Sequence, residues 1–207
     1  INSHNKSITF YGSKKIKNNT FIDLVIGAST LKIKQERIHT SGTYKGKRYA
    51  KQYYSSLVYS GKIKKSNITF SPYGRIDRGH TTLSSYEDKG KTAALRYNKQ
   101  NVVTNTTSIG LLANFKKNFK HIRLNTVARL EYGKEFNKTD DIQVSYLVRN
   151  ENYIIKINDK EKNHKKYGLA SDINIFKKLN INIKYETENI ENYGKINIYK
   201  MNASYSP

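Results

Sequence analysis

The chain has 207 residues, and 38 Lys and Arg against 16 Asp and Glu give it a formal net charge of +22. Aromatic residues make up 12% of the chain, with 17 Tyr, which argues against a disordered protein. The absence of Cys excludes a disulfide framework and a thiolate zinc site. Because only 2 Pro are present, no Pro-rich linker divides the chain, and we expect one domain over residues 1–207.

The charge invites the hypothesis of a nucleic-acid partner, because Lys and Arg neutralise phosphates. However, most of the basic residues are Lys, whereas recognition surfaces favour the forked guanidinium of Arg. A coding bias towards AT-rich codons, which raises Lys, Asn and Ile together, explains the charge more simply. No run approaches the roughly 18 apolar residues of a transmembrane helix. The sequence opens Ile-Asn-Ser-His without a leader, so we expect a fragment of a longer product.

Alternation of apolar and polar residues is the main structural signal, and it starts early in the chain. Residues 20–30 place Ile22, Leu24 and Ile26 on one face and Asp23 on the other. Because successive side chains of a strand point to opposite faces, this pattern predicts a β-strand. Similar alternation occurs in residues 68–77, 92–100, 107–115 and 167–176.

The alternation is longest in the second half of the chain. Residues 122–133 alternate with Val127 as the one exception on the polar face, and residues 179–188 alternate without exception. No window of similar length has the spacing of an amphipathic helix, so we predict an all-β protein whose strands form an antiparallel meander. About eleven strands are expected, near residues 6–12, 20–37, 48–60, 66–86, 91–100, 105–115, 122–136, 153–158, 167–176, 179–188 and 193–205.

Lysines gather between these segments, where we expect solvated turns. The clusters are Lys14, Lys15 and Lys17; Lys62, Lys64 and Lys65; Lys116, Lys117 and Lys120; Lys160, Lys162, Lys165 and Lys166; and Lys177 and Lys178.

Two architectures fit this pattern. A soluble sheet would pack its apolar face inward, whereas a transmembrane barrel would turn it to lipid and enclose the polar face in a wet lumen. Tyr and Phe near segment ends, such as Tyr59, Phe115 and Tyr185, favour the barrel, because aromatic girdles lie at both membrane interfaces. On the polar face, charges of both signs are compatible with either architecture.

Short runs along the chain resemble the C-terminal translocator barrel of bacterial autotransporters, the type V secretion proteins. The runs are Phe21 to Gly27 with Arg37, Gln52 with Ser56 and Leu57, Ser71 to Asp77, Tyr86 and Glu87 with Gly90, Ala94 to Tyr97 with Gln100, Ile109 to Leu111, Ala128 to Tyr132 with Phe136, and Tyr167 to Leu169. Their order and spacing carry the resemblance over nearly the whole chain. Its motif positions include Pro72, Tyr73, Arg75, Glu87, Gly90, Gly110 and Tyr132.

The resemblance implies an antiparallel transmembrane β-barrel of about twelve strands, threaded by an amino-terminal helix. That helix and the first strand are expected to be missing here. Residues 142–148 and 153–158 are each shorter than the roughly 9 to 11 residues of a spanning strand, and if both crossed, every upstream loop would change sides. Ser206 and Pro207 stand where the family favours a terminal aromatic, and Ile196 and Ile198 lie out of phase with the last strand, which suggests a bulge or a pair facing the lumen.

The expected lumen residues are the charged members of the polar faces. They are Asp23, Arg75, Asp77, Arg96, Arg129, Glu131, Lys184 and Glu186.

No motif in the sequence points to catalysis, a cofactor or a metal. All five His, which are His4, His39, His80, His121 and His164, are expected in turns or at strand ends, without metal-ligand spacing. Residues 42–47 lack the Gly-Lys-Ser/Thr ending of a phosphate loop. We interpret Asp140 and Asp141 as a solvated turn.

The resemblance therefore implies a non-enzymatic monomer in the bacterial outer membrane that anchors, and assists export of, a passenger domain absent from this chain. Its implied partners are outer-membrane lipid and lipopolysaccharide, the barrel assembly machinery and its own passenger, with no specific nucleic acid. The alternative is a soluble basic β protein that binds nucleic acid or acidic glycans through lysine-rich turns. A weaker third hypothesis is an outer-membrane hydrolase, for which no nucleophile, base and orienting residue can be named.

Overall fold

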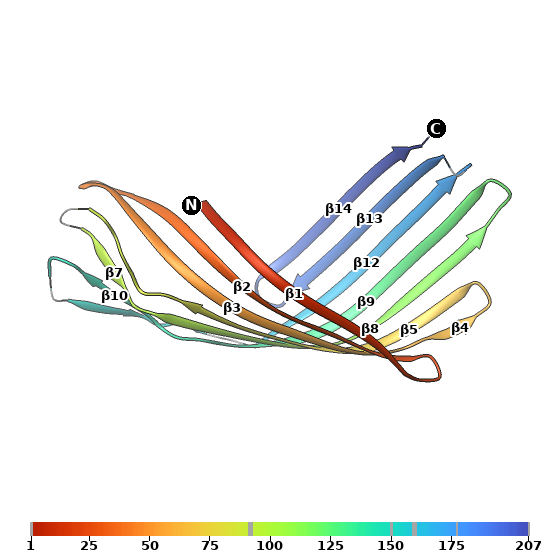
Figure 1. Cartoon of the computed structure of the whole chain (residues 1–207), viewed down its shortest axis with the longest axis horizontal. Coiled ribbons are helices and arrows are strands. Elements are labelled where there is room, and N and C mark those ends of the chain that lie inside the picture. Colours follow the sequence, from red (N-terminus) through yellow and green to blue (C-terminus); the bar gives the residue numbers. More distant parts are fainter. Residues whose placement is uncertain (1, 91–92, 150, 159–160, 177, 207) are drawn as a thin grey trace.

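A computed structural model describes residues 2–90, 93–149, 151–158, 161–176 and 178–206. Its main sheet is antiparallel and runs in chain order. The strands are β1 (Asn2–Lys17), β2 (Thr20–His39), β3 (Gly42–Gly61), β5 (Ile68–Leu83), β8 (Gln100–Asn118), β9 (Ile122–Thr139), β12 (Lys162–Ile175), β13 (Leu179–Ile190) and β14 (Gly194–Tyr205), with β4 (Ile63–Lys65) paired to β5. Figure 1 shows this sheet curled into an open trough whose edges are β1 and β14. The prediction of an all-β antiparallel meander is confirmed.

Short connections explain the meander, because antiparallel neighbours can be joined by turns of two or three residues. Asn19 turns the chain between β1 and β2 with φ 67°, and Asn192 and Gly194 do so between β13 and β14 with φ 63° and 108°. We call the end with the β1–β2 and β8–β9 connections the turn end, and the end with the β2–β3 and β13–β14 connections the loop end.

A second sheet lies at the loop end. It contains β6 (Tyr86–Glu87), β7 (Leu95–Tyr97), β10 (Ile142–Tyr146) and β11 (Asn152–Ile155) in the order β11-β10-β7-β6. The expected strands at residues 91–100 and 153–158 are therefore short pieces of this sheet and do not belong to the trough, and residues 91–92 and 159–160 lie outside the description. Because β10 and β11 belong to the second sheet, where β10 pairs with β11 and β7, neither adds a strand to the trough.

The most buried hydrophobic side chains fix the second sheet to the first. Tyr44 of β3 is 1% exposed, and its ring lies where a Cβ on Gly90 would be 2.1 Å away. Tyr86 covers Gly46 in the same way and stacks on Tyr97, with ring centroids 4.6 Å apart. Arg37 of β2 forms a 2.9 Å ion pair with the buried Asp88. The buried hydrophobic core thus lies at the loop end, whereas the buried side chains of the trough are polar.

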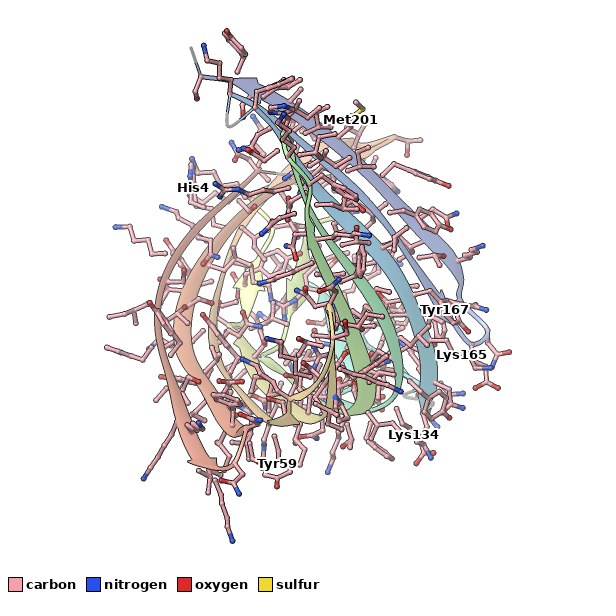
Figure 2. All side chains as sticks on the ribbon, turned by 90° about the vertical axis from the view of Figure 1, so that its right-hand side faces the viewer. His4, Tyr59, Lys134, Lys165, Tyr167 and Met201 are labelled. Carbon is pink, nitrogen blue, oxygen red and sulfur yellow. The ribbon has the colours of Figure 1, made fainter. Side chains whose placement is uncertain are left out.

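The two faces of the main sheet differ in chemistry. Its convex face carries many exposed apolar side chains, including Leu24, Ile26, Leu57, Ile76, Ile109, Leu111, Leu130, Leu169, Ile183 and Met201. The strand registers place these residues on one face, and Figure 2 shows Tyr59, Tyr167 and Met201 of that face outside the curl. Polar and charged side chains occupy the concave face. Soluble monomers rarely expose an apolar band of this extent.

The strands are longer than a membrane requires. The 20 residues of β2 span about 66 Å, whereas roughly 9 to 11 tilted residues cross the hydrocarbon core. Many lysines of the predicted clusters lie on these extensions: Lys14 to Lys17 belong to β1, Lys116 and Lys117 to β8, and Lys162 to Lys166 to β12. For these lysines the prediction of turns was wrong, because the paired strands continue beyond the apolar band. Lys120 and Lys178 do lie in the β8–β9 and β12–β13 connections, Lys64 and Lys65 belong to the short strand β4, and Lys160 and Lys177 lie outside the described residues.

The last strand keeps a regular register with β13. Ile198 is opposite Glu186 and Ile196 is opposite Glu188, with no bulge between them. Of the two alternatives for this pair, the structure therefore supports apolar residues on the concave face.

Candidate functional site: a charged cluster on the concave face

Glu131 of β9 is the centre of a charged cluster on the concave face. Its side chain is inaccessible to solvent, while its carboxylate accepts hydrogen bonds from Tyr73 at 2.5 Å, from Arg129 at 2.6 Å and from Arg75 at 3.0 Å. Arg75 also pairs with Asp77, at 2.9 Å from Nε to Oδ2. A buried charge is stable only when it is paired and hydrogen-bonded, and each oxygen of Glu131 meets that requirement.

Glycines allow these side chains to meet across strands. Gly110 of β8 lies opposite both Tyr73 of β5 and Glu131 of β9, and a Cβ on Gly110 would be 2.4 Å from Tyr73 Cζ. The Tyr73 ring therefore crosses over Gly110 to reach Glu131, two strands away. A larger residue at Gly110 would separate the phenol from the carboxylate.

A glycine also lies between two interacting side chains in the adjacent row of paired residues on the concave face. Gly133 lies between Ser108 and His164, and a Cβ there would be 2.0 Å from His164 Nε2 and 2.6 Å from Ser108 Oγ. His164 Nε2 lies 3.7 Å from Glu131 Oε1 and 3.5 Å from Ser108 Oγ. The expectation that His164 is a turn or strand-end surface residue was wrong, since it is 5% exposed within the sheet. Its place opposite Gly133 was not visible in the sequence, because it depends on the pairing of β9 with β12.

Ser108, His164 and Glu131 do not have the geometry of a catalytic triad. In a triad the nucleophile and the carboxylate contact opposite nitrogens of the imidazole, whereas here both approach Nε2. Among the described residues no group of three or more His, Asp or Glu could hold a metal ion. The arrangement instead cross-links β5, β8, β9 and β12 by charge-assisted hydrogen bonds.

Lys184 and Glu186 lie on the same face, further toward β14. Their side chains form an ion pair of 2.9 Å. Gly168 lies between Glu186 and Arg129, and a Cβ on it would meet the side chains of both at 3.8 and 3.6 Å. Asp23 of β2 lies in the register row that passes through Val58 to Arg75, and is half-buried.

Arg96 lies elsewhere. It belongs to β7 of the second sheet, where its Nε pairs with Glu87 at 2.7 Å and both side chains are 53% exposed. The main sheet has β5 ending at Leu83 and β8 starting at Gln100, and β7 belongs to the second sheet, so Arg96 does not lie on the concave face, contrary to expectation. The other expected lumen residues, which are Asp23, Arg75, Asp77, Arg129, Glu131, Lys184 and Glu186, all lie on it.

The family-like positions have different surroundings. Tyr73, Arg75 and Gly110 belong to the cluster, and Glu87 and Gly90 lie at the loop end. Pro72 is opposite Leu111, and Tyr132 is 45% exposed; both lie on the convex face.

A curled antiparallel sheet with an apolar convex face and a charged concave face defines a protein of the β-barrel class. In keeping with this, the family model of the autotransporter beta-domain matches residues 1–186. The chain therefore belongs to the autotransporter beta-domain family, which supports an outer-membrane translocator role. A comparison with curated proteins found no match. No helix in the described part of the chain is long and apolar enough to cross a membrane.

Proposed function

We propose that the chain forms the outer-membrane translocator that anchors, and assists export of, an amino-terminal passenger domain. The observation that carries this proposal is the contrast between the two faces: an exposed apolar band outside and a satisfied carboxylate network inside. In lipid, unpaired strand edges are costly, so β1 and β14 gain partners in the assembled barrel, either from each other or from further strands.

The mechanism needs no chemical step. The barrel assembly machinery inserts the chain, strand pairing satisfies the backbone groups, and the concave face becomes a hydrated lumen lined by the cluster around Glu131. The protein acts there as a monomer and not as an enzyme. The loop end faces the cell surface and the turn end faces the periplasm.

Refolding in detergent tests the membrane part of this proposal. The folded protein is expected to migrate differently on a denaturing gel before and after heating, and to resist protease when unheated. Solubility as a compact monomer in plain low-salt buffer would contradict the proposal.

Two epitope insertions test the orientation. An epitope between Asn192 and Tyr193, at the loop end, is expected to be accessible on intact cells. An epitope beside Lys120, at the turn end, is expected to become accessible only after the outer membrane is permeabilised. The opposite result would reverse the assigned sides.

Export is tested separately with a reporter domain placed before Asn2 and behind a secretion signal. The reporter is expected to become protease-accessible on intact cells. A reporter retained in the periplasm beside a folded barrel would overturn the translocator role alone.

A further inference from the structure

A groove on the convex face lies at the loop-side edge of the apolar band. It has a volume of about 460 Å³ and runs over β2 between the side chains of β1 and β3. Its floor is made of the small residues Ala28 and Thr30, so longer side chains on both sides form its walls.

Two register rows give the groove two chemistries. In the row nearer the loop end, Lys6 lies opposite Thr30, which lies opposite Lys51. In the adjacent row, Ile8 lies opposite Ala28, which lies opposite Tyr53. The two lysines and the Thr30 hydroxyl thus form a polar row on the loop side of an apolar row.

The cations of this groove have no anionic partner within the described part of the chain. The ion pairs among the described residues all join other side chains, and none includes Lys6 or Lys51. Both lysines are exposed, and the row beyond them adds Lys32, whose ammonium lies 5.7 Å from the ring centroid of Tyr49. An anion placed between Lys6 and Lys51 would therefore meet uncompensated positive charge.

We propose that this groove binds the phosphorylated, acylated glycolipid of the outer leaflet, of the lipid A type. The phosphate lies between Lys6 and Lys51 and accepts a hydrogen bond from the Thr30 hydroxyl, and an acyl chain lies over Ala28 between Ile8 and Tyr53. This inference rests on the proposed function, because it needs the convex face in lipid and the loop end at the cell surface.

Charge complementarity and the row order favour a membrane lipid over a free anion. A soluble phosphate would use the lysine row alone and would leave Ile8 and Tyr53, each 58% exposed, uncovered. A lipid covers both rows in the order in which they occur, because headgroups lie further from the bilayer centre than acyl chains.

The test is titration of the detergent-folded protein with diphosphoryl lipid A, followed by native mass spectrometry. Lys6→Gln with Lys51→Gln is expected to weaken binding by about 30-fold, which corresponds to two lysines near an anionic surface. Ala28→Trp fills the slot without changing the charge and is expected to weaken binding as well. The matched control is Lys14→Gln with Lys117→Gln, which removes two exposed cations from the convex face at the turn end and should leave binding unchanged.

The outcomes separate the hypotheses. Equal weakening by both lysine pairs would mean unspecific charge attraction and would overturn the site. Full competition by inorganic phosphate, with no effect of Ala28→Trp, would assign the lysines to a free anion and overturn the lipid occupant. A heat-modifiable barrel whose Lys6 and Lys51 variants bind lipid A normally would refute the groove alone. Failure of the wild-type chain to fold in detergent would refute the proposed function together with it.

Discussion

The hydroxyl of Tyr73 on β5 donates a hydrogen bond to Oε2 of Glu131 on β9, which is 58 residues away in sequence. The Tyr73 ring can cross the intervening strand β8 because the residue at the crossing point is Gly110. This hydrogen bond therefore depends on the register of β5, β8 and β9.

Replacement of Gly110 by Ala tests this crossing. The new Cβ would lie 2.4 Å from the Tyr73 ring, so the phenol must move away from Glu131, at a cost of about 1 to 3 kcal/mol. The temperature at which the gel band shifts should fall. Gly74→Ala is the control, because a Cβ there would meet nothing within 4 Å; an equal fall in both variants would contradict the role of the crossing.

Glu131→Gln tests the electrostatic part of the cluster. The change leaves Arg75 and Arg129 without their shared carboxylate, and we expect a loss of about 2 to 4 kcal/mol, since breaking a buried pair strands a charge. Glu87→Gln removes a carboxylate from an exposed pair with Arg96 and should cost less than about 1 kcal/mol. Chemical denaturation of the detergent-folded variants gives both values, and similar losses would mean that burial of the cluster is unimportant.

The sequence predicted which face a residue occupies better than it predicted which residues meet. Alternation correctly separated Arg75, Arg129 and Glu131 from Ile76 and Leu130. The contacts among them depend on register, which long-range pairing sets and which local periodicity does not encode. A shift of one residue in β8 would remove Gly110 from the crossing and break the cluster.

Arg96 and His164 also show that the local sequence does not determine which strands pair. Leu95, Arg96 and Tyr97 alternate as a strand should, and they do form one, but their partner is β10 instead of the main sheet. His164 lies in a lysine-rich stretch that looks like a turn, yet it pairs with Gly133 and Ile190 on both sides. For both residues, the pairing of strands distant in sequence determines the position in the fold, and local propensity does not.

The two faces can be compared within one strand. Ile183→Arg is expected to destabilise the barrel by about 2 to 4 kcal/mol if the side chain faces mid-bilayer lipid, whereas Asn182→Arg on the concave face should cost much less. Unfolding titrations in lipid vesicles measure the difference. Equal costs at the two positions would reverse or remove the assignment of the faces.

Asp140 should make the loop between β9 and β10 sensitive to acid. Its Oδ2 accepts hydrogen bonds from the backbone N–H of Asn101 at 2.9 Å and from the Asn101 amide at 2.8 Å, and the first of these is the main reason that the pKa of Asp140 lies below its usual range. A lowered pKa means that the contact stabilises the loop above about pH 4 and is lost as the pH falls through the lowered value. Protection of the Asn101 amide against hydrogen exchange, corrected for its intrinsic rate, should fall in strong acid. In Asp140→Asn this dependence should vanish, and its persistence would point to another group.

Nucleic-acid binding separates the barrel from a soluble basic β protein. Many of the lysines lie on strand extensions and on the hairpin of β4 and β5 at the turn end. These lysines attract any polyanion, but contacts with phosphates carry no sequence information. We expect Lys64→Gln, Lys65→Gln and Lys165→Gln together to leave folding in detergent unchanged, since all three side chains are exposed. Any binding of duplex DNA should be equal for unrelated sequences and lost by about 0.2 M salt, because each neutralised phosphate contributes to the salt dependence. Gel-shift titrations at several salt concentrations measure both properties. A sequence-selective complex that survives physiological ionic strength, and that these three substitutions weaken in steps, would favour the soluble protein over the translocator.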